Sequence, residues 1–382
     1  MAALFFLYTK YLEFFEMEKI NAVITGVGGY VPNYILDNEE MSRIVDTSDE
    51  WIMQRIGVKT RHILRPEQGS GTSYLMTRAV KQLLRKTQVD PASVELVICA
   101  TTTPDYHFPS TASLVIDACG LPQAFGFDME AACSGFLYAL EVGANFVRSG
   151  RYQRIIVCGG DHMSSMTNYE DRNTCPIFGD GAACVMMEAT TENYGLIDGF
   201  YRVDGIKGKA YEHLHMSAGG SARMPSHETV DGREHFVYQE GRAVYKHAVL
   251  DMTSAVKTII QRNGLSKENV DWVVPHQANI NIEASVAERI GISRDHVMVN
   301  IDHMANTSGG TLPLCLWEYE PRLKKGDNIV FTSFGAGFTW GASYMIWGYD
   351  GADEAAKEPA QFYKEGLISR EEWYKLRSAS EE

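Results

Sequence analysis

Val94-Glu-Leu-Val-Ile98 and Val270-Asp-Trp-Val-Val274 are two apolar, β-rich segments that align without gaps at an offset of 176 residues. The same offset relates Ala79-Val-Lys81 to Ala255-Val-Lys257, and each of these tripeptides precedes its apolar segment within a helical pattern. Two matched helix-to-strand units at one spacing indicate an internal duplication. The sequence therefore predicts a fold of two similar halves.

Short β-rich runs alternate with helical stretches in the first half. The order is Ala22–Thr25 (strand), Ser73–Lys86 (helix), Leu96–Ala100 (strand), a helix after Thr111, and Phe125–Asp128 (strand). Strands that alternate with helices are typical of parallel sheets buried between helical layers. We therefore predict a duplicated α/β fold, with mostly parallel central sheets and helices between the two halves.

A second, weaker sequence repeat indicates the limits of these halves. Ile155-Ile-Val157 and Gly181-Ala-Ala183 recur as Ile329-Val-Phe331 and Gly341-Ala-Ser343. We predict an N-terminal extension, an N-terminal half, a C-terminal half and a charged tail at residues 1–16, 17–190, 191–349 and 350–382. The tail holds a Ser369-x-x-Glu372 capping box that would head a short helix, although a solvated appendage is the simpler interpretation.

The composition restricts the possible ligands and compartments. The formal net charge is −14 at pH 7 and no Lys/Arg block is present, which argues against nucleic acid as the main ligand because phosphate neutralisation requires a basic face. No apolar run approaches the roughly 18 residues of a membrane span, so we predict a soluble protein with no membrane association. The seven cysteines are odd in number and form no CxxC pair, a pattern typical of the reducing cytoplasm.

Residues 207–239 are polar, rich in glycine, and contain four histidines (213, 215, 227 and 235). We predict a long loop near the functional site. A metal centre is a weak alternative, because no acidic residue or cysteine stands at ligand spacing beside these histidines.

Cys133 lies where a strand meets a helix, in Phe125-Gly-Phe-Asp-Met-Glu-Ala-Ala-Cys-Ser-Gly-Phe-Leu-Tyr-Ala-Leu140. Free N–H groups and the positive dipole end at a helix start favour thiolate over thiol, which predicts a reactive nucleophile. The alternative is a small buried cysteine. That description better fits the cysteines within or beside apolar runs, namely Cys99, Cys119, Cys158 and Cys184.

Two polar residues of the second half are candidates to act with Cys133. His276 follows the apolar run Val273-Val-Pro275, where the end of a buried strand can face the first half. Asn306 lies thirty residues later in a polar loop, where its amide can donate to an oxyanion. The alternatives are a structural histidine and an ordinary turn asparagine. The glycine-rich segment Phe334–Gly341 allows backbone N–H groups to approach a ligand, although it fails as a dinucleotide fingerprint on spacing.

The order Cys, His, Asn also occurs in papain-like proteases. Their local nucleophile signature, Cys-Gly-Ser-Cys-Trp, is absent, and the sequence around Cys133 is too apolar for a secreted protease cleft. A hydrolase is therefore a minor alternative.

Six motifs together resemble the thiolase superfamily, and specifically the β-ketoacyl-acyl-carrier-protein synthase III family. They occur in the family's order across residues 18–348 and read Asp46-Thr-Ser-Asp-Glu-Trp-Ile, Ala131-Ala-Cys-Ser-Gly-Phe, Phe178-Gly-Asp-Gly-Ala-Ala, Pro275-His-Gln-Ala-Asn, Asn306-Thr-Ser and Gly337-Phe-Thr-Trp-Gly. The asparagine distinguishes this family from biosynthetic thiolases, which have a second cysteine there, and from elongating synthases, which have a second histidine.

The resemblance implies a Cys-His-Asn triad of Cys133, His276 and Asn306. Cys133 would take the acyl group from an acyl-CoA, while His276 and Asn306 would bind the malonyl-acyl-carrier protein and stabilise the enolate left by decarboxylation. The backbone N–H groups of Cys133 and Ala336 would form the oxyanion hole, and Phe334 would help to exclude water. The implied activity is the condensation that initiates fatty-acid synthesis, with acyl-CoA as a substrate and with no cofactor or metal.

The resemblance also implies a CoA-binding surface and a homodimer. Matching positions give the CoA contacts as Trp51, Arg55, Arg172, Gly241, Arg242 and Asn279. Trp51 and Arg172 would sandwich the adenine, and Arg242 replaces the asparagine expected at its position. Phe108 resembles the residue that crosses the dimer interface to form the floor of the partner's acyl pocket.

Several departures from the family pattern concern carrier docking and pocket shape. Asn281 and Glu288-Arg289 stand where well-known members have basic docking residues, Lys246 is kept, and Met304-Ala305 replaces a more usual His-Gly. The main alternative function is a secondary-metabolite acyltransferase of the same family that moves an acyl group to a non-malonyl acceptor. An inert dimer partner is disfavoured by the presence of Cys133, and a plain thioesterase would give no condensation product.

Overall fold

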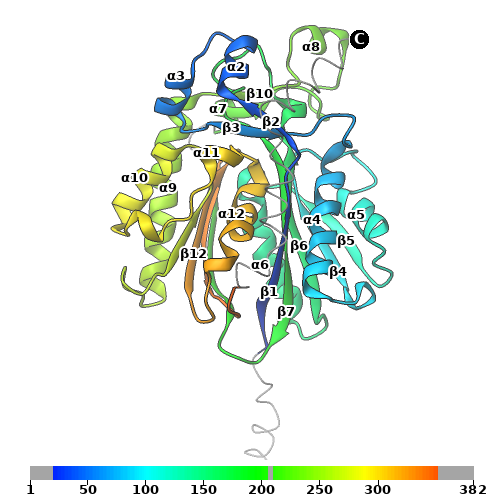
Figure 1. Cartoon of the computed structure of the whole chain (residues 1–382), viewed down its shortest axis with the longest axis vertical. Helices are drawn as coiled ribbons and strands as arrows, with labels where there is room; N and C mark the ends of the chain where they lie inside the picture. The colour runs from blue at the N-terminus through cyan, green and yellow to red at the C-terminus, as the bar shows by residue number, and fades with distance from the viewer. Residues whose placement is uncertain (1–19, 205–209, 352–382) are drawn as a thin grey trace, which may run out of the picture.

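The computed structural model describes residues 20–204 and 210–351. Within these ranges the chain forms two main sheets with helices between them and outside them (Figure 1). The expected extension at 1–16, most of the charged tail with its capping box at Ser369, and the start of the 207–239 segment lie outside the described residues. No helix in the described ranges combines the length and the apolar character needed to cross a membrane.

The first sheet has five strands in the order β1, β7, β6, β4, β5. These strands span Asn21–Tyr30, Asp180–Thr190, Arg154–His162, Leu96–Ala100 and Phe125–Met129. β4 is buried at every position, which explains its unbroken apolar sequence. It runs parallel to β5 and β6, whereas β7 is antiparallel to both β6 and β1.

The second sheet has four strands in the order β11, β12, β13, β8. They span Trp272–Pro275, Asn328–Gly335, Thr339–Ile346 and Gly195–Val203. The sequence repeat corresponds to equivalent units of the two sheets, because α4 (Gly71–Thr87) leads into β4 and α9 (Gly241–Arg262) leads into β11.

The predicted duplicated α/β fold is confirmed, but the expectation of mostly parallel sheets is wrong. Within the two main sheets of the described residues, three of the seven strand pairings are parallel, namely β4 with β5, β4 with β6, and β11 with β12. The remaining pairings are antiparallel. β12 returns as β13 through the bend at Ala336–Phe338, and a connection this short can join only antiparallel neighbours.

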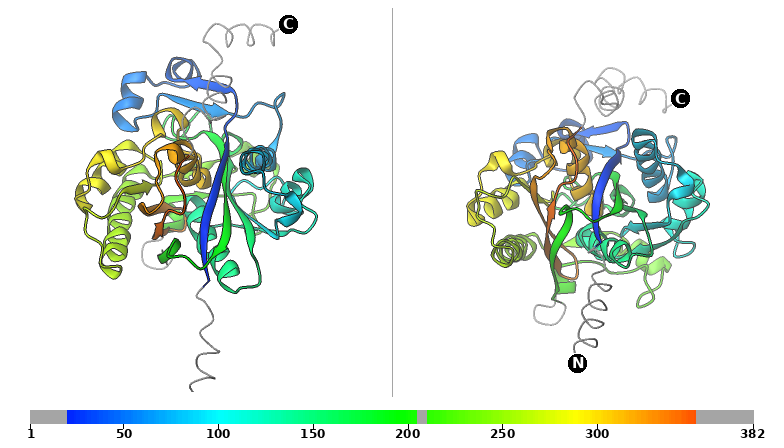
Figure 2. Two further views of the ribbon diagram at one scale, coloured as in Figure 1. Left: turned by 60° about the horizontal axis from the view of Figure 1, so that its bottom comes forward. Right: turned by 90° about the horizontal axis from the view of Figure 1, so that it is seen from below.

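Two helices lie between the sheets, as Figures 1 and 2 show. α6 (Gly135–Arg148) and α12 (Thr311–Tyr319) contribute Leu137 and Leu316 to one buried cluster, which also contains Ile98 of the first sheet and Phe331 of the second. The halves therefore share a single core. α4 and α5 (Thr111–Cys119) cover the outer face of the first sheet, and α9 and α10 (Ile280–Ile290) cover that of the second.

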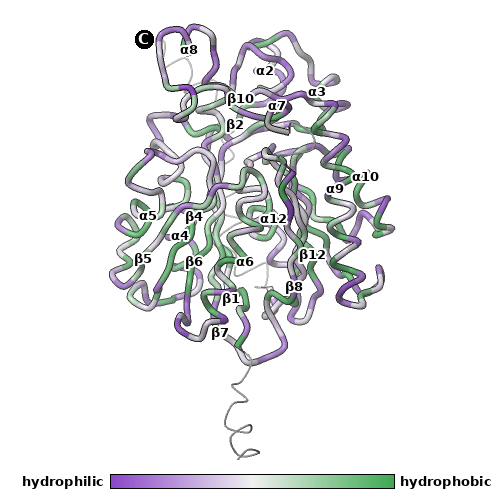
Figure 3. Tube along the Cα trace, turned by 180° about the vertical axis from the view of Figure 1, so that it is seen from behind, coloured by the Kyte–Doolittle hydropathy of each residue, from purple (hydrophilic) through white to green (hydrophobic). Residues whose placement is uncertain are grey.

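One end of the molecule, at the top of Figure 1, carries the remaining elements. They are β2 (Tyr34–Asp37), α2 (Asn38–Ile44), α3 (Asp49–Arg55), β3 (Thr60–Ile63), α7 (Ala210–His213), β9 (Leu214–Met216), α8 (His227–Asp231), β10 (Val237–Gln239) and α11 (Ile301–Met304). Residues 210–239, expected to be a loop, thus contain the two-stranded ribbon β9–β10 and short helices. Figure 3 shows that α2 and the segment around α8 are mainly hydrophilic, whereas the central elements are hydrophobic. Single 3₁₀ turns occur at Pro91–Ser93, Met163–Met166, Arg294–His296 and Glu320–Arg322.

Candidate active site

A pocket of about 770 Å³ brings Cys133, His276 and Asn306 together. Cys133 lies in a 3₁₀ turn, η2 (Ala132–Ser134), directly before α6. His276 follows the last residue of β11, and Asn306 lies between α11 and a second 3₁₀ turn, η5 (Ser308–Gly310). One residue thus comes from the first half and two from the second, and Cys133 lies more than 140 positions before the other two in the sequence.

The turn that carries Cys133 is fixed by the second sheet. Ser333 Oγ donates to the Cys133 carbonyl at 2.8 Å, and Thr339 Oγ1 donates to the Ala131 carbonyl at 3.0 Å. A Cβ atom on Gly335 would lie only 2.7 Å from the Cys133 backbone nitrogen, so this position accepts only glycine without movement of the turn. The β12–β13 bend is therefore packed against the backbone of the nucleophile.

The Cys133 thiol is half-buried, and its Sγ lies 3.7 Å from Ser308 Oγ. Burial raises the pKa of Cys133 to about 12, and the contact with Ser308 opposes this only in part. This desolvation acts against the thiolate that the helix start is expected to favour. The resting group is a thiol that must lose its proton during the reaction.

His276 is the candidate group to accept that proton. Its Nδ1 lies 2.7 Å from Thr311 Oγ1, and the Thr311 hydroxyl donates to the Ser308 carbonyl at 3.1 Å. Because this hydroxyl has one proton, it accepts from His276 Nδ1–H, which leaves Nε2 unprotonated. Burial lowers the pKa of His276 to about 3, so the imidazole is neutral at physiological pH.

The Asn306 side chain is oriented by its own loop. Asn306 Oδ1 accepts a hydrogen bond from the Ser308 N–H at 2.8 Å, which leaves the Nδ2 hydrogens to donate elsewhere. The Asn306 backbone pairs with the first half, since its N–H donates to the Ile177 carbonyl at 2.9 Å. Ala305 has φ 58° and ψ −168°, a region that glycine adopts more readily. The loop is thus held in one conformation beside the pocket.

Three of the predicted CoA contacts lie at the pocket or stack on a residue there. Trp51 and Arg55 line the pocket, and the Arg172 guanidinium lies 4.8 Å from the centre of the Trp51 ring. Arg172 also forms an ion pair with Asp46 at 3.4 Å. A base between Trp51 and Arg172 would require about 7 Å, two contacts of about 3.5 Å each. The two side chains must therefore separate if they are to sandwich an adenine.

The remaining predicted pocket residues are also present in the lining. Gly241 and Arg242 lie at the start of α9, while Phe334 and Ala336 lie at the end of β12 and in its bend. Asn279 lines the pocket too, but its side-chain groups are engaged: Oδ1 accepts from the Asn281 N–H, and Nδ2 donates to the Arg55 carbonyl. A side-chain contact between Asn279 and a ligand would have to replace one of these bonds.

Phe108 is not among the residues that line the pocket. Its side chain is 86% exposed, which is unusual for a phenylalanine in a single chain. The described residues alone therefore do not bring Phe108 together with Cys133.

Three residues that hold the reactive groups in place, directly or through a neighbouring residue, were not predicted from the sequence. Ser308 contacts Cys133 and Asn306, Thr311 contacts His276, and the buried Asp161 binds the loop that contains Ser308. Ser308 stood within a recognised motif, Asn306-Thr-Ser, but its contacts require the tertiary structure. Asp161 had one available signal, a carboxylate at the end of the buried run Ile155–Gly160.

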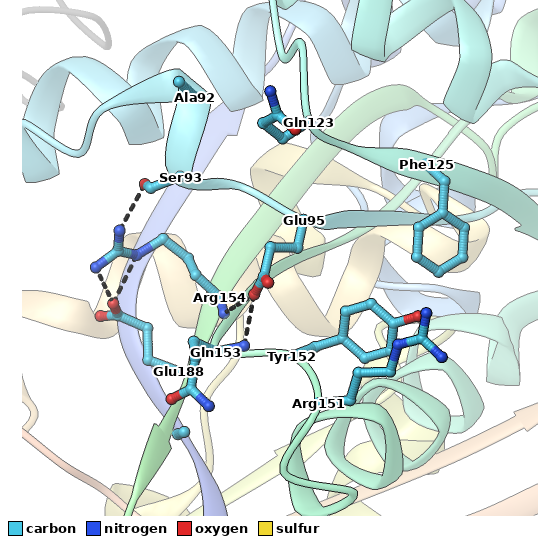
Figure 4. Close-up of a pocket in the computed structure, with 11 residues that line it drawn as sticks. Ala92, Ser93, Glu95, Gln123, Phe125, Arg151, Tyr152, Gln153, Arg154 and Glu188 are labelled. Atoms are coloured by element: carbon cyan, nitrogen blue, oxygen red, sulfur yellow. Dashed lines mark hydrogen bonds and ion pairs between the residues drawn. The ribbon is translucent and has the colours of Figure 1, made fainter.

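The 210–239 segment contributes Leu214, His215, Met216, Val237 and Gln239 to the pocket, which places it near the site as predicted. Among the described residues, no group of three His, Cys, Asp or Glu side chains is arranged to hold a metal ion. A second hollow lies by β5 and is shown in Figure 4. There the charged side chains Arg154, Glu188 and Glu95 are bonded to one another or to backbone, and neither cysteine nor histidine is among the lining residues.

Two similar halves that enclose a Cys, His and Asn pocket define a thiolase-like fold with an acyl-transfer site. The family model described as 3-oxoacyl-[acyl-carrier-protein (ACP)] synthase III matches residues 127–205, and the model of its C-terminal part matches residues 260–347. A relative from Bacteroides thetaiotaomicron, β-ketoacyl-[acyl-carrier-protein] synthase III 2, is 61% identical over 339 residues, which cover 89% of this chain and 100% of the relative.

Solved structures agree with these matches. The 3-oxoacyl-[acyl-carrier-protein] synthase III of Aquifex aeolicus has a TM-score of 0.77 and 35% identity, covering 85% of this chain and all of that one. The priming β-ketosynthase of the R1128 polyketide pathway has a TM-score of 0.79 and 28% identity, covering 87% of this chain and 97% of that one. The chain belongs to the β-ketoacyl-[acyl-carrier-protein] synthase III family, and it is an acyltransferase of the condensing type.

Proposed function

We propose that the chain condenses an acyl-CoA primer with malonyl-acyl-carrier protein, giving 3-oxoacyl-acyl-carrier protein, carbon dioxide and CoA, and so initiates fatty-acid synthesis. The observation that carries this proposal is the single pocket in which Cys133 of the first half meets His276 and Asn306 of the second. Residues 17–190 would supply the nucleophile, and residues 191–349 would supply the groups that handle the malonyl thioester.

In the first step, the Cys133 proton passes to Nε2 of His276 and the sulfur attacks the acyl-CoA carbonyl. The Nδ1–H bond to Thr311 leaves Nε2 of the neutral His276 ring as the nitrogen that can accept this proton. The oxyanion would be bound by the N–H groups of Cys133 and Ala336, each worth about 3 kcal/mol in such sites. The carbon–sulfur bond to CoA then breaks, and CoA leaves as its thiol with the proton held by His276.

In the second step, the malonyl thioester binds at Asn306 and His276, and the bond to its carboxylate breaks. The electron pair forms an enolate, whose oxygen would accept from Asn306 Nδ2. The enolate carbon attacks the Cys133 thioester and releases the Cys133 thiolate, which regains a proton from water. Phe334 is 3% exposed, and the centre of its ring lies 4.7 Å from the centre of the Phe338 ring. These apolar side chains would exclude water from the site and so favour loss of carbon dioxide.

The mouth of the pocket has the charge that polyanionic substrates require. Arg55 and Arg242 line the pocket and are exposed, and Lys246 is exposed one turn further along α9. On a chain of net charge −14 this local basic surface is suited to the phosphates of CoA and to an acidic carrier protein. Arg55 and Arg242, together with the retained Lys246, would compensate for the docking positions that are not basic here, Asn281 and Glu288.

We propose a homodimer in which Phe108 enters the partner's acyl pocket. Phe108 is 86% exposed, and Phe125 on the edge strand β5 is 43% exposed. An unpaired edge strand with an apolar side chain is a surface that a second copy can cover. We also propose a cytoplasmic location and no cofactor, since all seven cysteines are free thiols and the chemistry above uses only side chains and substrates.

Intact-protein mass spectrometry tests the function. The protein is mixed with acetyl, isobutyryl and longer acyl-CoAs and then with malonyl-carrier protein. We expect a mass gain at Cys133 that is discharged as 3-oxoacyl-carrier protein, and we expect Cys133→Ala to lose the adduct while malonyl decarboxylation is kept or increased.

The same experiment tests the secondary-metabolite alternative, to which the likeness to a polyketide priming enzyme gives weight. An adduct that is stable to malonyl-carrier protein but is discharged by another acceptor would favour that alternative. No adduct with any acyl-CoA, or equal loss of both partial reactions in Cys133→Ala, would overturn the assignment.

A further inference from the structure

Ser308 contacts all three candidate reactive residues, directly or through one hydroxyl. Its N–H donates to Asn306 Oδ1 at 2.8 Å, its carbonyl accepts from Thr311, which holds His276, and its Oγ lies 3.7 Å from Cys133 Sγ. Ser308 is 2% exposed and has φ 51°, in the left-handed region. A shift of this one residue would move the partners of every reactive group at once.

Ser308 belongs to the second half, but the next residue is anchored to the first. The Gly309 N–H donates to Asp161 Oδ2 at 2.8 Å, and Asp161 is fully buried near the end of β6. A Cβ on Gly159 would lie 2.4 Å from the Gly309 carbonyl, so the backbones of β6 and the loop are in close contact. The Ser308–Gly309 turn is therefore positioned by the sheet of the other half.

Asp161 is itself held more firmly than a core carboxylate requires. Its Oδ1 accepts from the Thr102 and Thr103 N–H groups, at 2.7 and 3.1 Å, and from the hydroxyls of Thr101, Thr102 and Thr103 at 2.7 to 3.1 Å. This cluster follows β4, the central parallel strand. One oxygen of the carboxylate is thus bound to the first half, and the other oxygen is bound to Gly309.

We propose that Asp161 is a positioning residue for the condensation: through the Gly309 N–H it holds Ser308, and through Ser308 it sets the relative positions of Cys133, His276 and Asn306. This role rests on the proposed function of those three residues. Asp161 lies outside the pocket lining and touches no substrate in this scheme. Its effect on the reaction is indirect, and it joins a nucleophile of one half to the malonyl-binding groups of the other.

Asp161→Asn is suited to test the bond between Asp161 and Gly309, because asparagine has nearly the same shape as aspartate. The amide oxygen remains with the threonine cluster, since the two fixed N–H groups of Thr102 and Thr103 outnumber the single N–H of Gly309. The amide nitrogen then faces Gly309, where two donors oppose each other and the bond is lost. Thr101→Val is the matched control, because it removes one donor to Oδ1 and leaves the Gly309 bond intact.

The first readout is the pair of partial reactions in the full-length protein. We expect Asp161→Asn to slow both Cys133 acylation and malonyl decarboxylation by at least tenfold, and Thr101→Val to change each by less than threefold at a similar loss of thermal stability. Equal slowing in the two variants, in proportion to their loss of stability, would overturn the proposal. So would an Asp161→Asn protein within threefold of wild type in both reactions.

A second readout needs no substrate, so it separates failure of this proposal from failure of the proposed function. The Ser308 contact lowers the pKa of Cys133, so Ser308→Ala should slow iodoacetamide alkylation of Cys133 several-fold. We expect Ser308→Ala to have no further effect in the Asp161→Asn background and its full effect in the Thr101→Val background. A full effect of Ser308→Ala in both backgrounds would show that Asp161 does not act through Ser308.

Discussion

At the scale of single residues, Cys133 and His276 are both uncharged before substrate arrives. Burial raises the pKa of the thiol to about 12 and lowers the pKa of the imidazole to about 3. Proton transfer between them would create an ion pair that burial in the pocket disfavours. An arriving thioester changes this balance, because attack of the sulfur transfers the negative charge to an oxyanion that backbone N–H groups can bind.

The first prediction concerns the resting thiol. Because the pKa of Cys133 is about 12, its thiolate fraction should rise about tenfold per pH unit throughout the range from pH 7 to 10. We expect the rate of iodoacetamide alkylation at Cys133 to follow this slope, measured by peptide mass spectrometry with Cys133→Ala to establish the background. A plateau below pH 9 would show instead that the helix start stabilises a thiolate.

At the scale of elements, the bend between β12 and β13 determines where the nucleophile lies. Gly335 lies against the Cys133 backbone nitrogen, and Ala336, the proposed oxyanion donor, is the next residue. The bend and the start of α6 are distant in sequence, and bonds from Ser333 and Thr339 join them. Their relative position is therefore a property of two packed elements and not of either one.

The second prediction is that Gly335→Ala strongly impairs Cys133 acylation. A Cβ at 2.7 Å from the Cys133 nitrogen must displace the turn, and a displacement of this kind can cost about 100-fold in rate. The acylation rate is measured by quenching the reaction at a series of times with a saturating acyl-CoA and recording the intact-protein mass. Gly220→Ala is the control, because a Cβ there meets nothing within 4 Å. Equal rates in the two variants would refute this account of the bend.

A second connection between elements joins α11 to α12 through His303. Burial alone would lower the pKa of His303, but Asp302 at 2.8 Å and Glu318 at 3.1 Å outweigh it and raise the pKa to about 10. Because the folded-state pKa exceeds the unfolded value of about 6.5, this stabilisation is complete below pH 6.5 and is lost as pH rises through 10.

The third prediction follows from the raised pKa of His303. His303→Gln should lower the free energy of unfolding by about 1 to 2 kcal/mol at pH 6, and the difference from wild type should shrink steadily towards pH 10. Urea denaturation at pH 6, 8 and 10 measures it. A difference that stays constant with pH would mean that His303 contributes through packing and not through charge.

At the scale of the whole molecule, each of the two main sheets has an edge strand that presents an apolar side chain to solvent. β5 is an edge of the first sheet and presents Phe125 at 43% exposure, while β8 is an edge of the second sheet and presents Ile197 at 39%. Phe108, the most exposed large hydrophobic side chain among the described residues, belongs to the same half as β5. The proposed dimer would therefore form through the first half.

The fourth prediction tests whether the dimer forms through the edge strand β5. Phe125→Lys should convert the protein to a monomer at micromolar concentration and reduce acyl-CoA use, because Phe108 would no longer reach a partner's pocket. Ile197→Lys introduces the same charge at a similar exposure on the other edge, and it should remain dimeric. Sedimentation velocity distinguishes these outcomes, and a monomeric wild type would exclude the dimer.

Much of the architecture could be predicted from local sequence. The repeated helix-to-strand units around residues 94–98 and 270–274 determined the duplication, since each unit has the periodicity of one helix and one buried strand. The turn at Cys133 and the glycine-rich bend were also evident, because glycines and small residues mark such positions. The direction of the strands was not, because the same apolar run fits parallel and antiparallel pairing.

Only the tertiary structure decided how the reactive groups are tuned and joined. A helix start suggested a thiolate at Cys133, but the extent of burial, which depends on residues far away in the chain, keeps it a thiol. The contact between Ser308 and Cys133 spans 175 residues, and the bond from Gly309 to Asp161 spans 148. Local sequence determines propensities of neighbouring residues, whereas desolvation and hydrogen bonds between the halves arise only when the two sheets pack around one core.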